Sequence, residues 1–321
     1  MRPATWRLCR RTAQRRPACS ATTRAAGRQE LEQTPFFPQS RYQCGPAALA
    51  TVLTARGVAV TPAALTERVY VPALHGSLRA EMTATARHFH MLAYPLRASL
   101  ADLLTEIAHG NPVLVFQNLG LQWLPRRHYA VAIGYDLETG EIILRSGTTR
   151  RWRTTLATFE RTWARGDYWA LVILPAGEMP ATAQPESYLQ AAHDLEADER
   201  NLPAAHAAYA AAIRRWPQLP LAWMAYGNDR YSAGDMAAAA RSFRQVTQLA
   251  PADANGWNNL AYALQQSGCP QQALRAARCA VSLAPAAAGY RDTLADMVAG
   301  AQGSDGAHCA PVRCDATTTA P

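Results

Sequence analysis

Residues 39–49 read QSRYQCGPAAL, and a second stretch, HYAVAIGYD, begins at His128, 84 positions after Cys44. Pro46 and the apolar residues that follow at helical spacing predict a helix whose first turn begins at Cys44. The positive end of a helix dipole favours a thiolate over a thiol. This position makes Cys44 a candidate nucleophile, and a buried structural cysteine at a helix start is the alternative.

The second stretch predicts a β-hairpin that carries a candidate base. Residues 126–147 read RRHYAVAIGYDLETGEIILRSG, with apolar residues along both arms and turn residues at 137–140. His128 begins the first arm, where an ordinary strand-end histidine is the alternative reading. Gln39, five residues before Cys44, is placed to donate its side-chain amide to an oxyanion, together with the backbone N–H of Cys44.

The two stretches together resemble the double-glycine leader peptidases that process bacteriocin precursors, a branch of the papain-like cysteine peptidases. The resemblance covers about residues 33–175 and rests on Gln, a short spacer, Cys-Gly-Pro-Ala-Ala-Leu, and then His-Tyr-x-Val-x-x-Gly-Tyr-Asp. It implies an α+β papain-like peptidase domain that cleaves Gly-Gly leaders. In that domain Cys44 would be the nucleophile, His128 the general base and then acid, and Gln39 the oxyanion donor.

The hairpin departs from this family at the residue that orients the histidine. The family usually closes the second strand with Asp-Pro, whereas this chain has Ser146-Gly147. Asp136 lies eight residues along the strand from His128, about 26 Å at ~3.3 Å per residue, which is too far to orient that ring. The turn instead returns residues 146–149 beside His128. Ser146 is therefore the candidate for the third role, and it would hold the imidazole without a carboxylate charge.

A short stretch between these motifs is expected to border the site. Residues 75–78 read His-Gly-Ser-Leu and are predicted to form a loop before a helix. A loop of this kind can line a substrate cleft. Further on, a helix, a Gly-Asn-Pro turn and a buried strand are predicted between residues 99 and 119, as the peptidase fold requires between nucleophile and base.

The second half of the chain carries a repeat with a period of 34 residues. Five side chains mark this interval: Pro217, Pro251, Pro285, Trp223 and Trp257. The pattern resembles the tetratricopeptide repeat, a helix pair that buries its apolar face by stacking on its neighbours. It implies an all-α tetratricopeptide-repeat solenoid after the peptidase domain, with a groove for a peptide or a partner protein. A helical appendage that only stabilises its neighbour is the alternative.

Composition divides the chain into five segments. Residues 1–32 are predicted to be a disordered Arg-rich tail, 33–175 the peptidase domain, 176–187 a linker, 188–300 the helical repeats and 301–321 a second disordered tail. The linker lies within the proline-rich stretch PAGEMPATAQPES. The length of 321 residues and the 49% hydrophobic content suit two cores.

Charge and hydropathy limit the partners. The net charge of +8 arises mainly in the first 30 residues, where eight arginines face one acid, so no nucleic-acid partner is expected. No stretch of 18 apolar residues predicts a transmembrane segment, and no apolar run near the start predicts a signal peptide. RPACS, around Cys19, is at most a decayed lipid-attachment site. Localisation stays open, with the cell envelope expected from the family resemblance.

The cysteines predict no metal site. Seven cysteines and eight histidines form no CxxC pair and no zinc spacing, so no metal and no cofactor are expected. If the protein is exported, Cys309 and Cys314 are candidates for a tail disulfide. Cys269 and Cys279 are expected to pack within the repeat helices.

Three function classes fit the chain. A cysteine peptidase with a helical-repeat module that binds a protein or peptide is favoured. A catalytically weak peptidase-like protein, acting as a peptide-binding adaptor, is the alternative, and the missing carboxylate would be the trace of lost catalysis. An acyl transferase on the same scaffold is the third class, in which an amine would outcompete water at the thioester.

Overall fold

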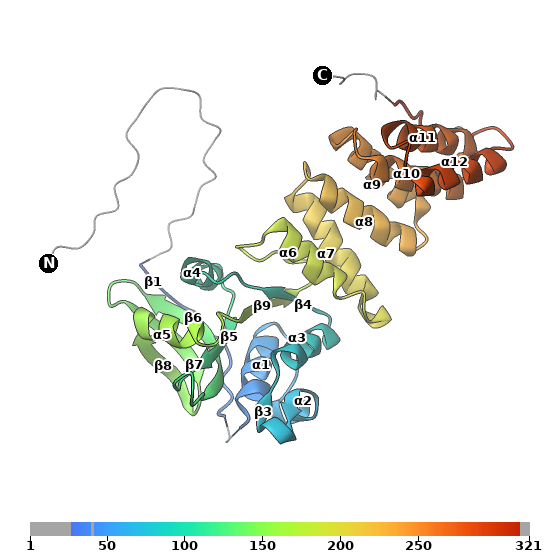
Figure 1. Cartoon of the computed structure of the whole chain (residues 1–321). Coiled ribbons are helices and arrows are strands. Elements are labelled where there is room, and N and C mark those ends of the chain that lie inside the picture. The colour runs from blue at the N-terminus through green and yellow to red at the C-terminus, as the bar shows by residue number, and fades with distance from the viewer. Residues whose placement is uncertain (1–26, 40–41, 315–321) are drawn as a thin grey trace, which may run out of the picture.

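The computed structural model describes residues 27–39 and 42–314, and it consists of a mixed α/β domain joined to a row of helices (Figure 1). The first domain contains β1 (Arg28–Glu30), α1 (Cys44–Ala55), α2 (Pro62–Val69), β2 (Tyr70–Val71), β3 (Gly76–Ser77), α3 (Arg79–His88), β4 (Met91–Pro95), α4 (Leu100–Ala108), β5 (Val113–Asn118), β6 (Arg127–Asp136), β7 (Glu141–Ser146), β8 (Thr149–Thr155), α5 (Leu156–Ala164) and β9 (Ala170–Pro175). The row contains α6 (Pro185–His193), α7 (Leu202–Arg215), α8 (Pro220–Ser232), α9 (Met236–Leu249), α10 (Ala254–Gln266), α11 (Pro270–Leu283) and α12 (Ala288–Gly300).

One antiparallel sheet organises the first domain. Its strands run in the order β4-β9-β5-β6-β7-β8, and β1 also pairs with β6. Alternate residues of β6 face opposite layers: Val131 packs in the cluster that contains α1, whereas Ala130 packs in the cluster that contains α4 and α5. Because both faces are covered, β6 is a nearly continuous apolar run, and the sheet fixes the strand that carries His128.

The start of α1 lies against the small β2–β3 sheet. A Cβ atom on Gly45 would lie 2.2 Å from Oγ and 2.6 Å from Cβ of Ser77, so only glycine permits this approach. Pro46 occupies the first turn of the helix, as the sequence predicts. The packing places Cys44 at the junction of α1, β3 and β6.

The predicted hairpin is confirmed, with β6 and β7 on either side of the turn at 137–140. Asp136 closes this turn by accepting hydrogen bonds from the backbone N–H groups of Glu138 and Thr139. Asp136 therefore lies at the opposite end of β6 from His128, and Ser146 at the end of β7 returns toward that histidine. This hairpin geometry keeps Asp136 too far away to orient the His128 ring, and it places Ser146 beside that ring.

The N-terminal segment differs from the predicted tail of 1–32. Residues 28–30 form β1 on the edge of β6, and the buried guanidinium of Arg145 donates to the carbonyl oxygens of Glu32 and Thr34. These bonds hold the chain that leads into Gln39. Residues 1–26, with the RPACS stretch around Cys19, lie outside the described residues.

The predicted linker at 176–187 is an ordered junction. Glu106 of α4 is fully buried, and its carboxylate accepts hydrogen bonds from Ala181 N, Thr182 N, Thr182 Oγ1 and Asn111 Nδ2. α6 begins at Pro185, inside the predicted linker, and its Tyr188 belongs to the same apolar cluster as the sheet. The proline-rich composition predicts a linker here, and a buried acid with four donors fixes that linker in place.

The helices of the row follow the 34-residue period. α7, α9 and α11 begin at 202, 236 and 270, and α8, α10 and α12 begin at 220, 254 and 288. The indole N–H groups of Trp223 and Trp257 donate to Pro217 O and Pro251 O, each at 2.8 Å. In the next unit Arg291 replaces the tryptophan and donates to Pro285 O at 2.6 Å. The same hydrogen bond therefore recurs every 34 residues, in step with the helices.

The C-terminal segment also differs from the predicted disordered tail. Residues 301–314 run beside α11, where Val312 is buried and its N–H donates to Gln272. The disulfides pair Cys269 with Cys309 and Cys279 with Cys314, in place of the expected Cys309–Cys314 bond.

Two spacings explain this pairing. Cys269 and Cys279 are ten residues apart along α11, which is about 15 Å at ~1.5 Å per residue. Cys309 and Cys314 are five residues apart in the tail, and five extended residues cover ~16 Å, so the two distances match. The tail is therefore joined to α11 at two points. Cys269, His308 and Cys309 bring possible metal-ligand atoms within 4.8 Å of one another, but both sulfurs are in the disulfide. Residues 315–321 lie outside the described part. Among the helices that the structure describes, none has the length and apolar character of a membrane span.

Candidate active site

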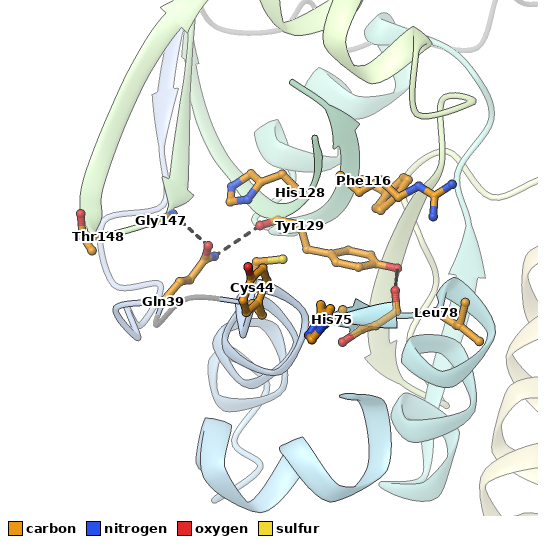
Figure 2. Close-up of a pocket in the computed structure, with 13 residues that line it drawn as sticks. Gln39, Cys44, His75, Leu78, Phe116, His128, Tyr129, Gly147 and Thr148 are labelled. Atoms are coloured by element: carbon orange, nitrogen blue, oxygen red, sulfur yellow. Dashed lines mark hydrogen bonds between the residues drawn. The ribbon is translucent and has the colours of Figure 1, made fainter. Parts of the chain in front are cut away.

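A cavity of about 440 Å³ lies where α1, β3 and β6 meet (Figure 2). Three of the four predicted site residues line it, namely Gln39, Cys44 and His128. The fourth, Ser146, contacts His128 directly. Cys44, at the start of the helix, and His128, on the strand, face the same space. The structure therefore brings together four residues from two segments, 39–44 and 128–146, that are 84 positions apart in the sequence.

Cys44 is half-buried and lies in the first turn of α1. Burial raises the pKa of its thiol above the ordinary value, and hydrogen bonding to the backbone of Tyr129, Gly45 and Cys44 itself opposes this rise. The sequence predicted a lowered pKa from the helix dipole. The sheet and β3 cover the helix start, however, and the loss of hydration there outweighs the local dipole. The resting sulfur is a thiol.

His128 is held by Ser146 through one ring nitrogen. The distance between His128 Nε2 and Ser146 Oγ is 2.8 Å. Burial, and then the charge of Arg126, lower the pKa of His128 to about 4, so the imidazole is neutral at physiological pH. In the tautomer whose Nε2–H donates to Ser146, the basic nitrogen is Nδ1, the atom that could accept a proton from Cys44. The pair at rest is a neutral thiol and a neutral base.

Gln39 lies between two backbone groups of the hairpin. Its Nε2 donates to Tyr129 O at 3.3 Å, and its Oε1 accepts from Gly147 N at 3.0 Å (Figure 2). An additional backbone bond joins Gln39 N to Gly147 O. Since an amide NH₂ has two hydrogens, one remains to donate into the cavity beside Cys44. This arrangement suits the predicted oxyanion donor.

Residues 75–78 line the cavity, as expected for a loop that borders a cleft. Tyr129, whose role the sequence does not predict, links this stretch to the hairpin because its hydroxyl donates to Ser77 O at 3.2 Å. The buried Ser77 Oγ has no hydrogen-bond partner among the described residues. The His-Tyr dipeptide of the quoted motif was the signal for Tyr129, whereas nothing near Ser77 in the sequence marks it.

The pH dependence of Cys44 alkylation tests whether Cys44 and His128 are both neutral at rest. Because a thiol with a raised pKa reacts through its small thiolate fraction, the rate with iodoacetamide should rise roughly tenfold per pH unit from pH 5.5 to 8.5. An ion pair would instead give a plateau across this range. Mass spectrometry of the Cys44 peptide after timed labelling measures the rate, with His128→Ala as the companion variant. A pH-independent rate that collapses in His128→Ala would contradict the neutral pair.

Three comparisons bear on this domain. Residues 31–169 match the Peptidase_C39 like family. Among solved structures, a putative C39-like peptidase from Bacillus anthracis aligns at 16% identity over 46% of this chain and 97% of its own, with a TM-score of 0.39. The peptidase domain of Streptococcus ComA, a bi-functional ABC transporter involved in a quorum sensing pathway, aligns at 18% identity over 44% of this chain and 99% of its own, with a TM-score of 0.37. No curated protein matches the chain.

Proposed function

We propose that the domain matching the Peptidase_C39 like family is a cysteine peptidase of the double-glycine type, with Cys44, His128, Ser146 and Gln39 as its working residues. The single observation that carries this proposal is the cavity that Cys44 and His128 both line, with His128 Nε2 held by Ser146 at 2.8 Å. Cleavage after Gly-Gly rests on the resemblance of the two motifs to leader peptidases.

The neutral pair defines the first chemical step. As the Cys44 sulfur attacks the scissile carbonyl carbon, its proton passes to His128 Nδ1, and the C–S bond forms while the carbonyl π electrons move to oxygen. Gln39 Nε2–H and the backbone N–H of Cys44 donate to the resulting oxyanion. The tetrahedral intermediate collapses, and the C–N bond breaks. The imidazolium gives its proton to the leaving amine, so an acyl thioester and a free amine remain.

Hydrolysis then regenerates the site. His128, neutral again, takes a proton from a water molecule that attacks the thioester carbon. Collapse of the second intermediate breaks the C–S bond, releases the carboxylic acid and returns the proton to Cys44. Ser146 accepts the Nε2–H hydrogen bond throughout, which keeps the ring in the required tautomer but adds no negative charge. We therefore expect a slow enzyme.

The helical row is proposed to be a tetratricopeptide-like module that binds a peptide or a partner protein. A cavity of about 290 Å³ between α8, α9 and α10 is lined by Asn228, Tyr231, Phe243, Asn259 and Tyr262. Asn259 Nδ2 donates to Asn228 Oδ1 at 3.2 Å, so two amides lie side by side. Side-chain amides can pair with peptide backbone groups, which supports this role. If catalysis is absent, this groove would make the chain a peptide-binding adaptor.

Peptide hydrolysis tests the function. Purified wild-type protein is incubated with a peptide library in which Gly-Gly is followed by varied residues, and mass spectrometry identifies the products. We expect cleavage that disappears in Cys44→Ala and falls by about 10³-fold or more in His128→Ala. Thr149→Ala, which changes an exposed side chain at the start of β8, is the matched control. If the wild-type protein is folded but cleaves no peptide, the result would favour the alternative function, a peptide-binding adaptor without catalysis.

A further inference from the structure

The loop between β5 and β6 exposes four large apolar side chains within six residues. Their exposed fractions are 45% for Leu119, 55% for Leu121, 78% for Trp123 and 61% for Leu124. Elsewhere in the part of the chain that the structure describes, exposed large apolar residues occur singly along the sequence. A concentrated exposed patch of this kind marks an interaction site.

The backbone of this loop is hydrogen-bonded within itself. Asn118 Oδ1 accepts from the N–H groups of Gly120 and Arg126, and Leu119 N donates to Arg126 O at 2.9 Å. At the tip, Leu124 N donates to the carbonyl oxygen of Leu121. These bonds close the base of the loop, whereas the backbone N–H groups of Leu121, Gln122 and Trp123 at its tip have no partner among the described residues. Such groups can bond to headgroups and water at a bilayer interface, so the loop suits the interface and not the apolar centre of a membrane.

Positive charge surrounds the base of the loop. Arg126 and Arg127 are both exposed, and residues 107–135 contain no Asp or Glu. Arg165 donates from Nε to Asn118 O at 3.1 Å, which adds a third guanidinium at the base. Asp167, the acid nearest to Arg165 in the sequence, is in an ion pair with Arg79. The loop therefore combines an apolar tip with a cationic rim.

We propose that residues 119–126 insert into the surface of an anionic lipid bilayer and hold the cavity of Cys44 near the membrane. None of the four apolar side chains lines that cavity, so they offer a protrusion and not a groove for a peptide. Tryptophan, leucine and arginine in this arrangement match the bilayer interface, where rings and aliphatic groups enter the acyl boundary and arginines meet anionic headgroups. Arg127 and Phe116, on either side of the loop, line the cavity, so the site would open beside the bilayer.

Vesicle flotation tests this proposal, which does not depend on peptidase activity. Full-length protein is mixed with vesicles of phosphatidylcholine alone or with about 30 mol% phosphatidylglycerol. We expect flotation with the anionic vesicles, weakening at high salt, and at least a tenfold loss of binding in the double variant Trp123→Ser/Leu124→Ser. Trp152→Ser, on β8 and 50% exposed, is the matched control and should float like the wild type.

Fluorescence quenching separates insertion of the loop from binding by the Arg-rich N-terminal segment. Brominated phosphatidylcholine in the anionic vesicles should quench part of the tryptophan emission of the wild type and of Trp152→Ser, and not that of the loop variant. Absence of wild-type flotation, or equal binding and quenching in the loop variant, would overturn the proposal. A loop variant that loses peptide cleavage while the wild type binds no vesicles would also overturn it and assign the loop to a peptide.

Discussion

Replacing Glu106 with glutamine should lower the free energy of unfolding by about 3 kcal/mol. Each carboxylate oxygen accepts two hydrogen bonds: Oε1 from Thr182 N and Thr182 Oγ1, and Oε2 from Asn111 Nδ2 and Ala181 N. Turned toward Asn111 and Ala181, the new NH₂ faces two donors, and turned toward Thr182 it faces the backbone N–H, while the Thr182 hydroxyl can rotate to accept. Each unsatisfied buried partner costs about 1–3 kcal/mol, which sets the expected loss.

Urea denaturation followed by circular dichroism measures this loss. Glu178→Gln is the control, because it changes the same chemical group at an exposed position beside the same junction and should alter stability by less than about 0.5 kcal/mol. If Glu106→Gln lost less than about 1 kcal/mol, the carboxylate would not be the anchor of the junction.

The same carboxylate has a consequence for the orientation of the helical row. Glu106 joins α4 to residues 181–182, and α6 begins three residues later with its Tyr188 in the core of the sheet. The first helices of the row are therefore continuous with the first domain and not tethered to it.

Local patterns in the sequence predicted much of the site. The helix start at Cys44, the strand at His128 and the turn between β6 and β7 depend on residues close in the chain. Once that turn was placed, hairpin geometry returned Ser146 to His128, and it excluded Asp136 at the other end of the strand.

The features that the sequence did not predict depend on residues far apart in the chain. Glu106 reads as an ordinary helix acid, since its partners at 181–182 lie about 75 positions later. The pairing of Cys269 with Cys309 depends on the tail lying along α11, and no local pattern reports that. The pKa of Cys44 differs from its predicted direction for a similar reason, because the covering sheet is remote in sequence whereas the helix dipole is local.

Replacing Ser146 with aspartate should raise kcat/KM for peptide cleavage by about 10²-fold. The present hydroxyl accepts the Nε2–H bond but leaves the pKa of His128 lowered to about 4 by burial and by Arg126. A carboxylate at the same position would favour the imidazolium and raise that pKa, so that His128 becomes a stronger base at neutral pH. The transition state, in which His128 gains a proton, would be stabilised more than the neutral resting state. Ser146→Ala should lower kcat/KM by about tenfold, because the ring loses its tautomer control.

The pH dependence of Cys44 alkylation distinguishes this charge effect from a simple repacking. In the present chain His128 is neutral above about pH 4, so it cannot stabilise the thiolate, and the rate should rise steadily with pH. In Ser146→Asp the raised pKa of His128 keeps the ring protonated to higher pH, so an ion pair forms and the rate gains a plateau that ends as pH rises through the new pKa. Thr139→Asp adds the same charge at the exposed turn at the other end of the hairpin and should leave the slope unchanged. An unchanged profile in Ser146→Asp would mean that position 146 does not control the proton on His128, and the serine would then be a packing residue instead of the third member of the site.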